Sequence, residues 1–192
     1  MLGNNKYRQV PVKLRILILI MHLVILPLAF FAGYSSRLDF ITARTLYNSY
    51  KAFATNLLKN ASQVDVLSYR IFFHNANLVI SCFVPLLGTL NAIYSVYTTG
   101  TVLKAVSMIE NVKISILFHV LTSPVFWLEF LSISIASSES IVITILMIKN
   151  GFNKAAQEES GVFLGLILLS LSLLLLSATI EAIEILGAHI AF

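Results

Sequence analysis

Charged residues are scarce in this chain of 192 residues. Only 11% of them are Asp, Glu, Lys or Arg, whereas soluble domains carry about a quarter. Hydrophobic residues make up 58%, and they fall in runs near the length of about 20 residues that a bilayer requires. These proportions exclude an ordinary soluble domain. They indicate an all-α, polytopic transmembrane bundle that forms a single membrane domain over residues 1–192, with the lipid bilayer as its first partner.

Residue patterns that carry chemistry are also few. The single cysteine, Cys82, excludes an intrachain disulfide framework. The four histidines have no i, i+4 pair, which argues against a zinc site; they are His22, His74, His119 and His189. No phosphate-binding glycine loop or serine–base motif occurs. We therefore expect no metal, no cofactor and no enzymatic activity. The net charge of +4 is scattered along the chain, which argues against nucleic acid binding.

Five segments are predicted to cross the membrane. They are residues 15–34, 71–97, 100–122, 124–149 and 161–187. The second is longer than a bilayer requires, so it either projects outside or breaks at Pro85 and Gly88. The third contains Lys104, Glu110 and Lys113 before its apolar half. Because charges are costly in lipid, a re-entrant or half-inserted helix is the alternative there.

Residues 37–60 have a different pattern. Their larger apolar residues recur at four-three-four spacing, at Leu46, Tyr50, Phe53 and Leu57. This spacing predicts an amphipathic helix that lies on the outer membrane surface or packs over the bundle. Ser36 and Asp39 have the spacing of a capping box at its start.

Short motifs mark helix ends and helix packing. Ser123 suits an N-cap, and Pro124 suits the first position of the helix over residues 124–149. Gly161 and Gly165 form a G-x-x-x-G motif, which permits close contact between membrane helices. We expect Gly88, Pro124, Gly161 and Gly165 to be packing positions.

Basic residues indicate the orientation. Four of them precede the first span, at Lys6, Arg8, Lys13 and Arg15. The positive-inside rule then places the N-terminus in the cytoplasm. With five spans, the C-terminus lies outside, so we expect a multi-pass protein of the cell membrane.

Several carboxylates lie in or near the predicted spans. Glu129 is close to the outer start of the fourth span, and Glu181 and Glu184 are close to the outer end of the fifth. Because the last two are three residues apart, they share a helix face. We expect a polar cluster near the outer leaflet, with Arg70 as the candidate partner of these carboxylates and Glu139 deeper in the bundle. The cluster either pairs internally and holds the helices together, or forms a substrate or proton site.

The order of features from residue 71 onward resembles the stage II sporulation protein M family of bacteria and archaea. That family has a phenylalanine–asparagine motif, a glycine-bearing span, a glycine turn, a P-H-G-x-x-E element and a late alanine-rich helix with a glutamate. The similar positions here are Ile71 to Asn75, Gly88, Thr99-Gly100, Pro124 to Glu129 and Ala178 to Ala182. Val125 and Phe126 replace the family's His-Gly.

This resemblance implies an all-helical membrane protein without known enzymatic activity. The bacterial relatives act as membrane partners of a cell-wall-remodelling machine. The resemblance also implies that Glu129 and Glu181 are paired features of one fold.

The sequence therefore favours a membrane scaffold or subunit of a membrane assembly, with a membrane protein or a second copy of this chain as partner. The alternative is a transporter or permease subunit with a polar site around Glu129 and Glu181. A scaffold predicts paired carboxylates and a filled interior, whereas a permease predicts a wet path that reaches Glu139. An exposed apolar face on the amphipathic helix favours a partner protein.

Overall fold

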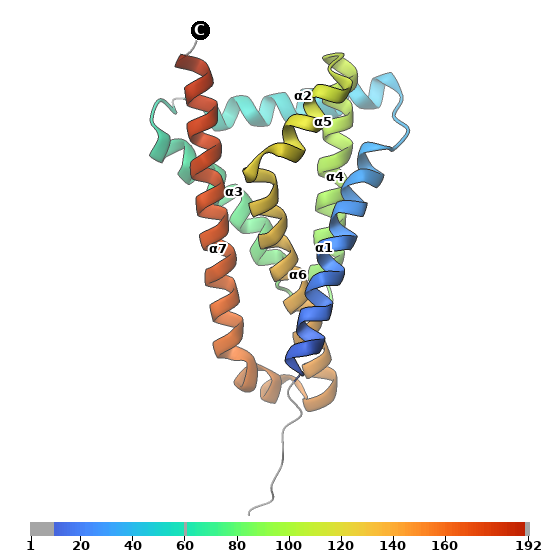
Figure 1. Ribbon diagram of the computed structural model, residues 1–192, viewed down its shortest axis with the longest axis vertical. Helices are drawn as coiled ribbons and strands as arrows, with labels where there is room; N and C mark the ends of the chain where they lie inside the picture. The colour runs from blue at the N-terminus through green and yellow to red at the C-terminus, as the bar shows by residue number, and fades with distance from the viewer. Residues whose placement is uncertain (1–9, 60, 191–192) are drawn as a thin grey trace, which may run out of the picture.

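A computed structural model describes residues 10–59 and 61–190. This part of the chain is helical and contains no strand, which confirms the all-α prediction. The helices form a bundle with one helix lying across one end (Figure 1). Their bounds are α1 Val12–Tyr34, α2 Phe40–Leu58, α3 Val64–Cys82, α4 Gly88–Ile109, α5 Lys113–Thr122, α6 Pro124–Asn150 and α7 Phe152–Ile190.

Within the described residues, three helices are long and apolar enough to cross a membrane. They are α1, α6 and residues 159–187 of α7. α6 is the central helix, because 61% of its most apolar stretch is buried, whereas the corresponding stretches of α1 and α7 are 28% and 22% buried. The apolar side chains that α1 and α7 leave exposed suit contact with lipid tails.

The predicted span 71–97 is not one helix. α3 ends at Cys82 and α4 begins at Gly88, so the break falls at Pro85 and Gly88, the second of the two alternatives left open for this segment. Pro85 has no amide hydrogen to continue a helix. Leu86 has a φ of 68°, and this left-handed backbone reverses the chain.

α6 supports this break through its side chains. The Ser140 hydroxyl donates to the Val84 carbonyl at 2.7 Å, and the Leu86 amide donates to the Thr144 hydroxyl at 2.9 Å. A Cβ atom on Gly88 would overlap the Cys82 carbonyl and the Ser140 side chain. Side chains of α6 therefore satisfy backbone groups of this irregular segment.

The predicted span 100–122 is also divided. α4 ends at Ile109, the chain turns at Asn111 with a φ of 59°, and α5 begins at Lys113. The charged residues of this segment fall around the turn, which explains why one continuous span was the wrong prediction. α5 then descends from the α2 end of the bundle to meet α6 (Figure 1).

α6 begins as its sequence predicts. The Ser123 hydroxyl accepts a hydrogen bond from the Val125 amide at 3.2 Å, and Pro124 is in the first turn. Pro124 therefore marks a helix start, and Ser123 separates α5 from α6.

α2 lies across the end of the bundle where α1 and α7 finish (Figure 1). Its N-cap is Asp39, whose carboxylate accepts from the Thr42 amide at 2.9 Å. The cap is therefore Asp39 itself, three residues after the Ser36 of the predicted capping box. The Tyr47 hydroxyl donates to Glu110 at 3.0 Å; this bond raises the pKa of Tyr47 and ties α2 to the α4–α5 turn.

Replacing Asp39 with Ala should loosen the first turn of α2. The hydrogen bonds from Thr42 hold the pKa of Asp39 below its usual value, so the ionised form stabilises the helix start. The depressed pKa means that this stabilisation is present above pH 3.8, the ordinary value, and is lost as the pH falls through the lower folded-state value. Hydrogen exchange at the Thr42 amide should accelerate in Asp39→Ala. Unchanged exchange at that amide would contradict the capping role.

Candidate functional site

Glu129 lies on α6 near the α2 end of the bundle, where three other helices approach it. Its Oε1 atom accepts a hydrogen bond from the Asn75 amide nitrogen of α3 at 2.6 Å. The Ser177 hydroxyl of α7 donates to the Val125 carbonyl of α6 at 3.3 Å. Polar contacts around Glu129 therefore link α6 to α3 and to α7.

A cavity of about 150 Å³ adjoins this carboxylate. We call it the Glu129 cavity; its polar lining is His74, Asn75, Thr99 and Glu129, and its apolar lining includes Phe126, Phe130 and Leu174. The side chains of His74 and Thr99 are exposed, so they form the rim between α3 and α4. The interior at Glu129 is therefore not filled by protein atoms.

A second, smaller cavity lies between α2, α3 and α7. We call this space of about 100 Å³ the Glu181 cavity; Tyr50, Phe53, Leu57, Leu67, Ile71 and Glu181 are among the residues that line it. The predicted apolar face of α2 thus covers it, although Tyr50 remains 46% exposed and Phe53 38% exposed. Burial raises the pKa of Tyr50, and the charge of Glu181 adds to this effect.

The two cavities are neighbours. Phe53 of the Glu181 cavity stacks on His74 of the Glu129 cavity, with ring centroids 4.5 Å apart. Glu181 is also close enough to Glu129 for the two carboxylates to repel each other electrostatically. The structure thus brings together Glu129 and Glu181, and it places the exposed Glu184 one turn further along α7.

Arg70 has other partners than these carboxylates. Its guanidinium donates to the backbone carbonyls of Leu57 and Lys59, at 2.9 Å and 2.5 Å. Leu57 is in the last turn of α2 and Lys59 is its C-cap, where backbone carbonyls have no donor within the helix. Arg70 therefore caps α2, because its side chain extends toward that helix end.

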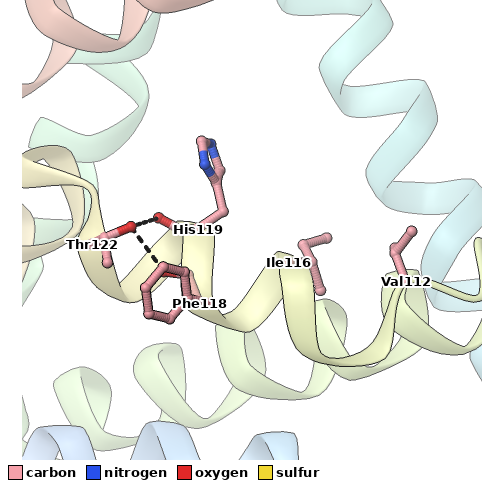
Figure 2. A pocket seen from close by; sticks show the side chains of 5 residues that line it. All are labelled: Val112, Ile116, Phe118, His119 and Thr122. Carbon is pink, nitrogen blue, oxygen red and sulfur yellow. Dashed lines mark hydrogen bonds between the residues drawn. The ribbon is translucent and has the colours of Figure 1, made fainter.

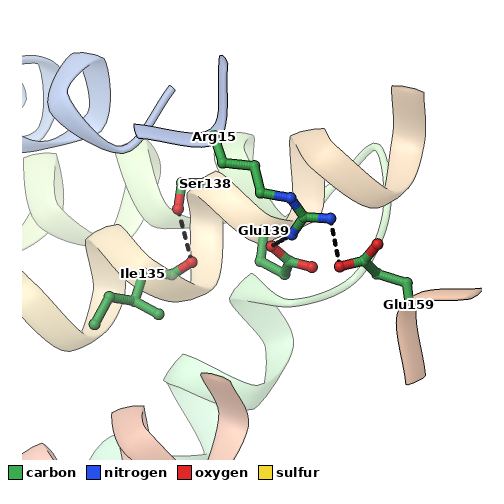
Figure 3. A network of polar contacts seen from close by, with 5 residues as sticks. All are labelled: Arg15, Ile135, Ser138, Glu139 and Glu159. Carbon is green, nitrogen blue, oxygen red and sulfur yellow. Dashed lines mark hydrogen bonds and ion pairs between the residues drawn. The ribbon is translucent and has the colours of Figure 1, made fainter. Parts of the chain in front are cut away.

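Glu139 belongs to a separate site at the opposite end of the bundle. Figure 3 shows the Arg15 guanidinium between two carboxylates, 3.3 Å from Glu139 and 2.5 Å from Glu159. Glu139 is 3% exposed and its Oε1 atom has no hydrogen-bond partner. This cluster is not predictable from sequence pattern, because Arg15 and Glu139 are 124 residues apart.

The exposed side of α5 carries a broad depression of about 560 Å³ (Figure 2). Its lining is Val112, Ile116, Phe118, His119 and Thr122. The Thr122 hydroxyl donates to the Phe118 and His119 carbonyls of its own helix, and the His119 ring points away from α5. Only one of these lining side chains, His119, is titratable, so the lining does not form a catalytic site.

The glycines differ from their predicted roles. A Cβ atom on Gly161 or Gly165 would have no neighbour within 4 Å, so neither glycine allows a close helix contact within the described part of the chain. A Cβ on Gly33 would overlap the Tyr97 carbonyl, and one on Gly100 would overlap the Phe30 carbonyl. α1 and α4 therefore pack backbone to backbone at glycines that form no G-x-x-x-G motif.

No family model, curated protein or solved structure matches this chain.

Proposed function

We propose that this chain is a five-pass protein of the cell membrane that serves as a scaffold or subunit of a membrane assembly. α1, α6 and α7 supply three passes. The antiparallel courses of α3 and α4 along the bundle in Figure 1 support two more. The N-terminus is then cytoplasmic and α2 and the C-terminus are outside, as the positive-inside rule favours. The resemblance to the stage II sporulation protein M family supports the same function.

The observation that carries the subunit function is the exposed apolar surface of α2. This helix lies across the bundle end, and Phe40 and Ile41 in its first turn are 63% and 79% exposed. Exposed apolar side chains gathered on one element are typical of a protein or membrane interaction surface. A second membrane protein that covers α2 is the partner proposed here.

A pull-down from native membranes tests this function. The wild-type chain should recover a membrane protein in fixed stoichiometry, and Ile41→Glu should lose it because the added charge would be buried at the interface. Asn48→Glu is the matched control, since Asn48 is an exposed polar residue of the same helix. It should keep the partner. Recovery of the wild-type chain without a stoichiometric partner would refute the subunit function.

The second candidate function is that of a transporter or permease subunit. The Glu129 cavity favours it, because the cavity places a carboxylate and an amide against unfilled space. Glu139 does not extend this site, since its charge faces Arg15. Flux through proteoliposomes that falls in Glu129→Gln and persists in Glu110→Gln would support this function, whereas equal flux in both variants would oppose it.

A further inference from the structure

We propose that the Glu129 cavity binds a small alkylammonium group, which enters from the α2 end of the bundle. This inference rests on the second candidate function, because it names the ligand class of the same polar site. Three observations carry it: the sign of the charge around the cavity, the chemistry of its lining, and the route that leads to it.

Acidic side chains gather around the cavity, because Glu129 lines it and Glu181 and Glu184 lie on the neighbouring stretch of α7. In the described residues, both ion pairs use Arg15, which lies at the other end of the bundle. Glu129 has an amide donor for one oxygen, and Glu181 repels it. Arg70, the nearest predicted counter-charge, donates to backbone carbonyls instead. A cationic ligand would therefore meet carboxyl groups that form no ion pair with another described residue.

The lining selects an organic cation over a metal ion. The oxygen-bearing side chains of the cavity belong to Asn75, Thr99 and Glu129. Calcium and magnesium require about six or more oxygen ligands, and these three side chains supply fewer. The remaining wall is aliphatic and aromatic, and it includes Phe126 and Phe130. Such a wall suits an alkyl chain beside a cationic head.

The volume of the Glu129 cavity limits the size of the ligand. About 150 Å³ corresponds to about five water molecules at about 30 Å³ each. A typical drug-sized ligand needs about 300 Å³ or more. An ammonium group with a short alkyl chain fits this space, and a nucleotide or sugar does not.

The carboxylates also mark a route. Glu184 is exposed, Glu181 is partly buried, and Glu129 adjoins the cavity beyond the Phe53–His74 ring pair. A series of like charges that leads into a low-dielectric cleft concentrates ions of the opposite sign. Phe53 belongs to α2, so its ring contact with His74 joins α2 to the rim of the Glu129 cavity.

The ammonium group has two possible sources, a soluble amine or the headgroup of an ethanolamine lipid. Isothermal titration of the full-length protein in detergent distinguishes them. The soluble probe is isobutylammonium chloride, with 2-methylpropan-1-ol as its uncharged counterpart. The lipid probe is dihexanoyl-phosphatidylethanolamine, with dihexanoyl-phosphatidylglycerol as the amine-free counterpart.

The wild-type protein should bind isobutylammonium with saturation, and Glu129→Gln should weaken that binding about 10- to 100-fold, as loss of a charged hydrogen-bond partner does. Glu110→Gln is the matched control and should leave it unchanged, because Glu110 faces Tyr47. Leu78→Phe provides a second variant, since Leu78 lines the cavity and the larger ring should block binding without changing a charge.

Saturable binding of the lipid probe alone, with the same dependence on Glu129, would support the proposal and assign the headgroup as the source. The proposal is overturned if neither ammonium probe binds, if the uncharged counterparts bind equally well, or if Glu129→Gln binds like the wild type while its thermal unfolding is normal. An uptake assay separates this result from the permease function. Binding without uptake would support the ammonium site and contradict the permease function. Glu129-dependent uptake of an uncharged solute would support the permease function and contradict the ammonium ligand.

Discussion

Replacing Arg15 with Gln is expected to destabilise the protein by about 3–5 kcal/mol, the usual effect of breaking a buried ion pair by removing one partner. The variant leaves Glu139 and Glu159 facing each other at the narrow end of the bundle. Their side chains are 3% and 8% exposed, so water would solvate the orphaned charges poorly. The free energy of unfolding in a mixed-micelle denaturant titration measures this loss.

Lys13→Gln is the matched control for the Arg15 cluster. Lys13 precedes Arg15 on α1, and its side chain is exposed, so its loss should change the free energy of unfolding by less than about 0.5 kcal/mol. The double variant Arg15→Gln with Glu139→Gln should recover part of the stability, because it removes one unpaired buried charge. Equal effects of Arg15→Gln and Lys13→Gln would show that the cluster does not hold the helices together.

Replacing Gly100 with Val should separate α1 from α4. A Cβ atom at Gly100 would overlap the Phe30 carbonyl and approach the Tyr34 amide nitrogen, and backbone atoms cannot move aside as a flexible side chain can. We expect a loss of about 3 kcal/mol in the free energy of unfolding, at the upper end of the usual effect of overpacking. Thermal unfolding of the purified protein in detergent measures it.

Gly165→Val serves as the control for Gly100, because a Cβ at Gly165 meets open space. Its unfolding free energy should differ from that of the wild type by less than about 0.5 kcal/mol. Comparable losses at Gly100 and Gly165 would contradict the α1–α4 contact. A change of oligomeric state in Gly165→Val would instead assign the G-x-x-x-G motif to contact between copies of the chain.

Local features of this fold follow from short stretches of sequence. The start of α6 at Ser123 and Pro124 was predicted because a cap and an N1 proline act within one helical turn. The break before Gly88 was one of two alternatives, since Pro85 removes an amide hydrogen. The long segment had enough apolar residues for either alternative, and the contacts from Ser140 and Thr144 to the break decide between them.

Contacts between distant helices were much less predictable. α1 and α7 are apolar around most of their circumference, so their sequences do not indicate which face turns inward. The pairing of Arg15 with Glu139, and of Asn75 with Glu129, depends on that rotation. Arg70 was near the expected level but is directed toward the C-terminus of α2. The position of a charged residue along the length of the bundle can be predicted from sequence. The residue with which it forms an ion pair or hydrogen bond cannot.

Cysteine labelling in intact and permeabilised cells tests the five-pass arrangement most directly. Cys82 is fully buried, so single cysteines can be added to the natural chain as Asn48→Cys on α2, Leu86→Cys in the α3–α4 turn and Asn153→Cys at the start of α7. Leu86 is 66% exposed. We expect a membrane-impermeant maleimide to label position 48 in intact cells, and positions 86 and 153 only after permeabilisation. Labelling of position 86 from outside would contradict the passes assigned to α3 and α4, and with them the membrane arrangement on which the proposed function rests.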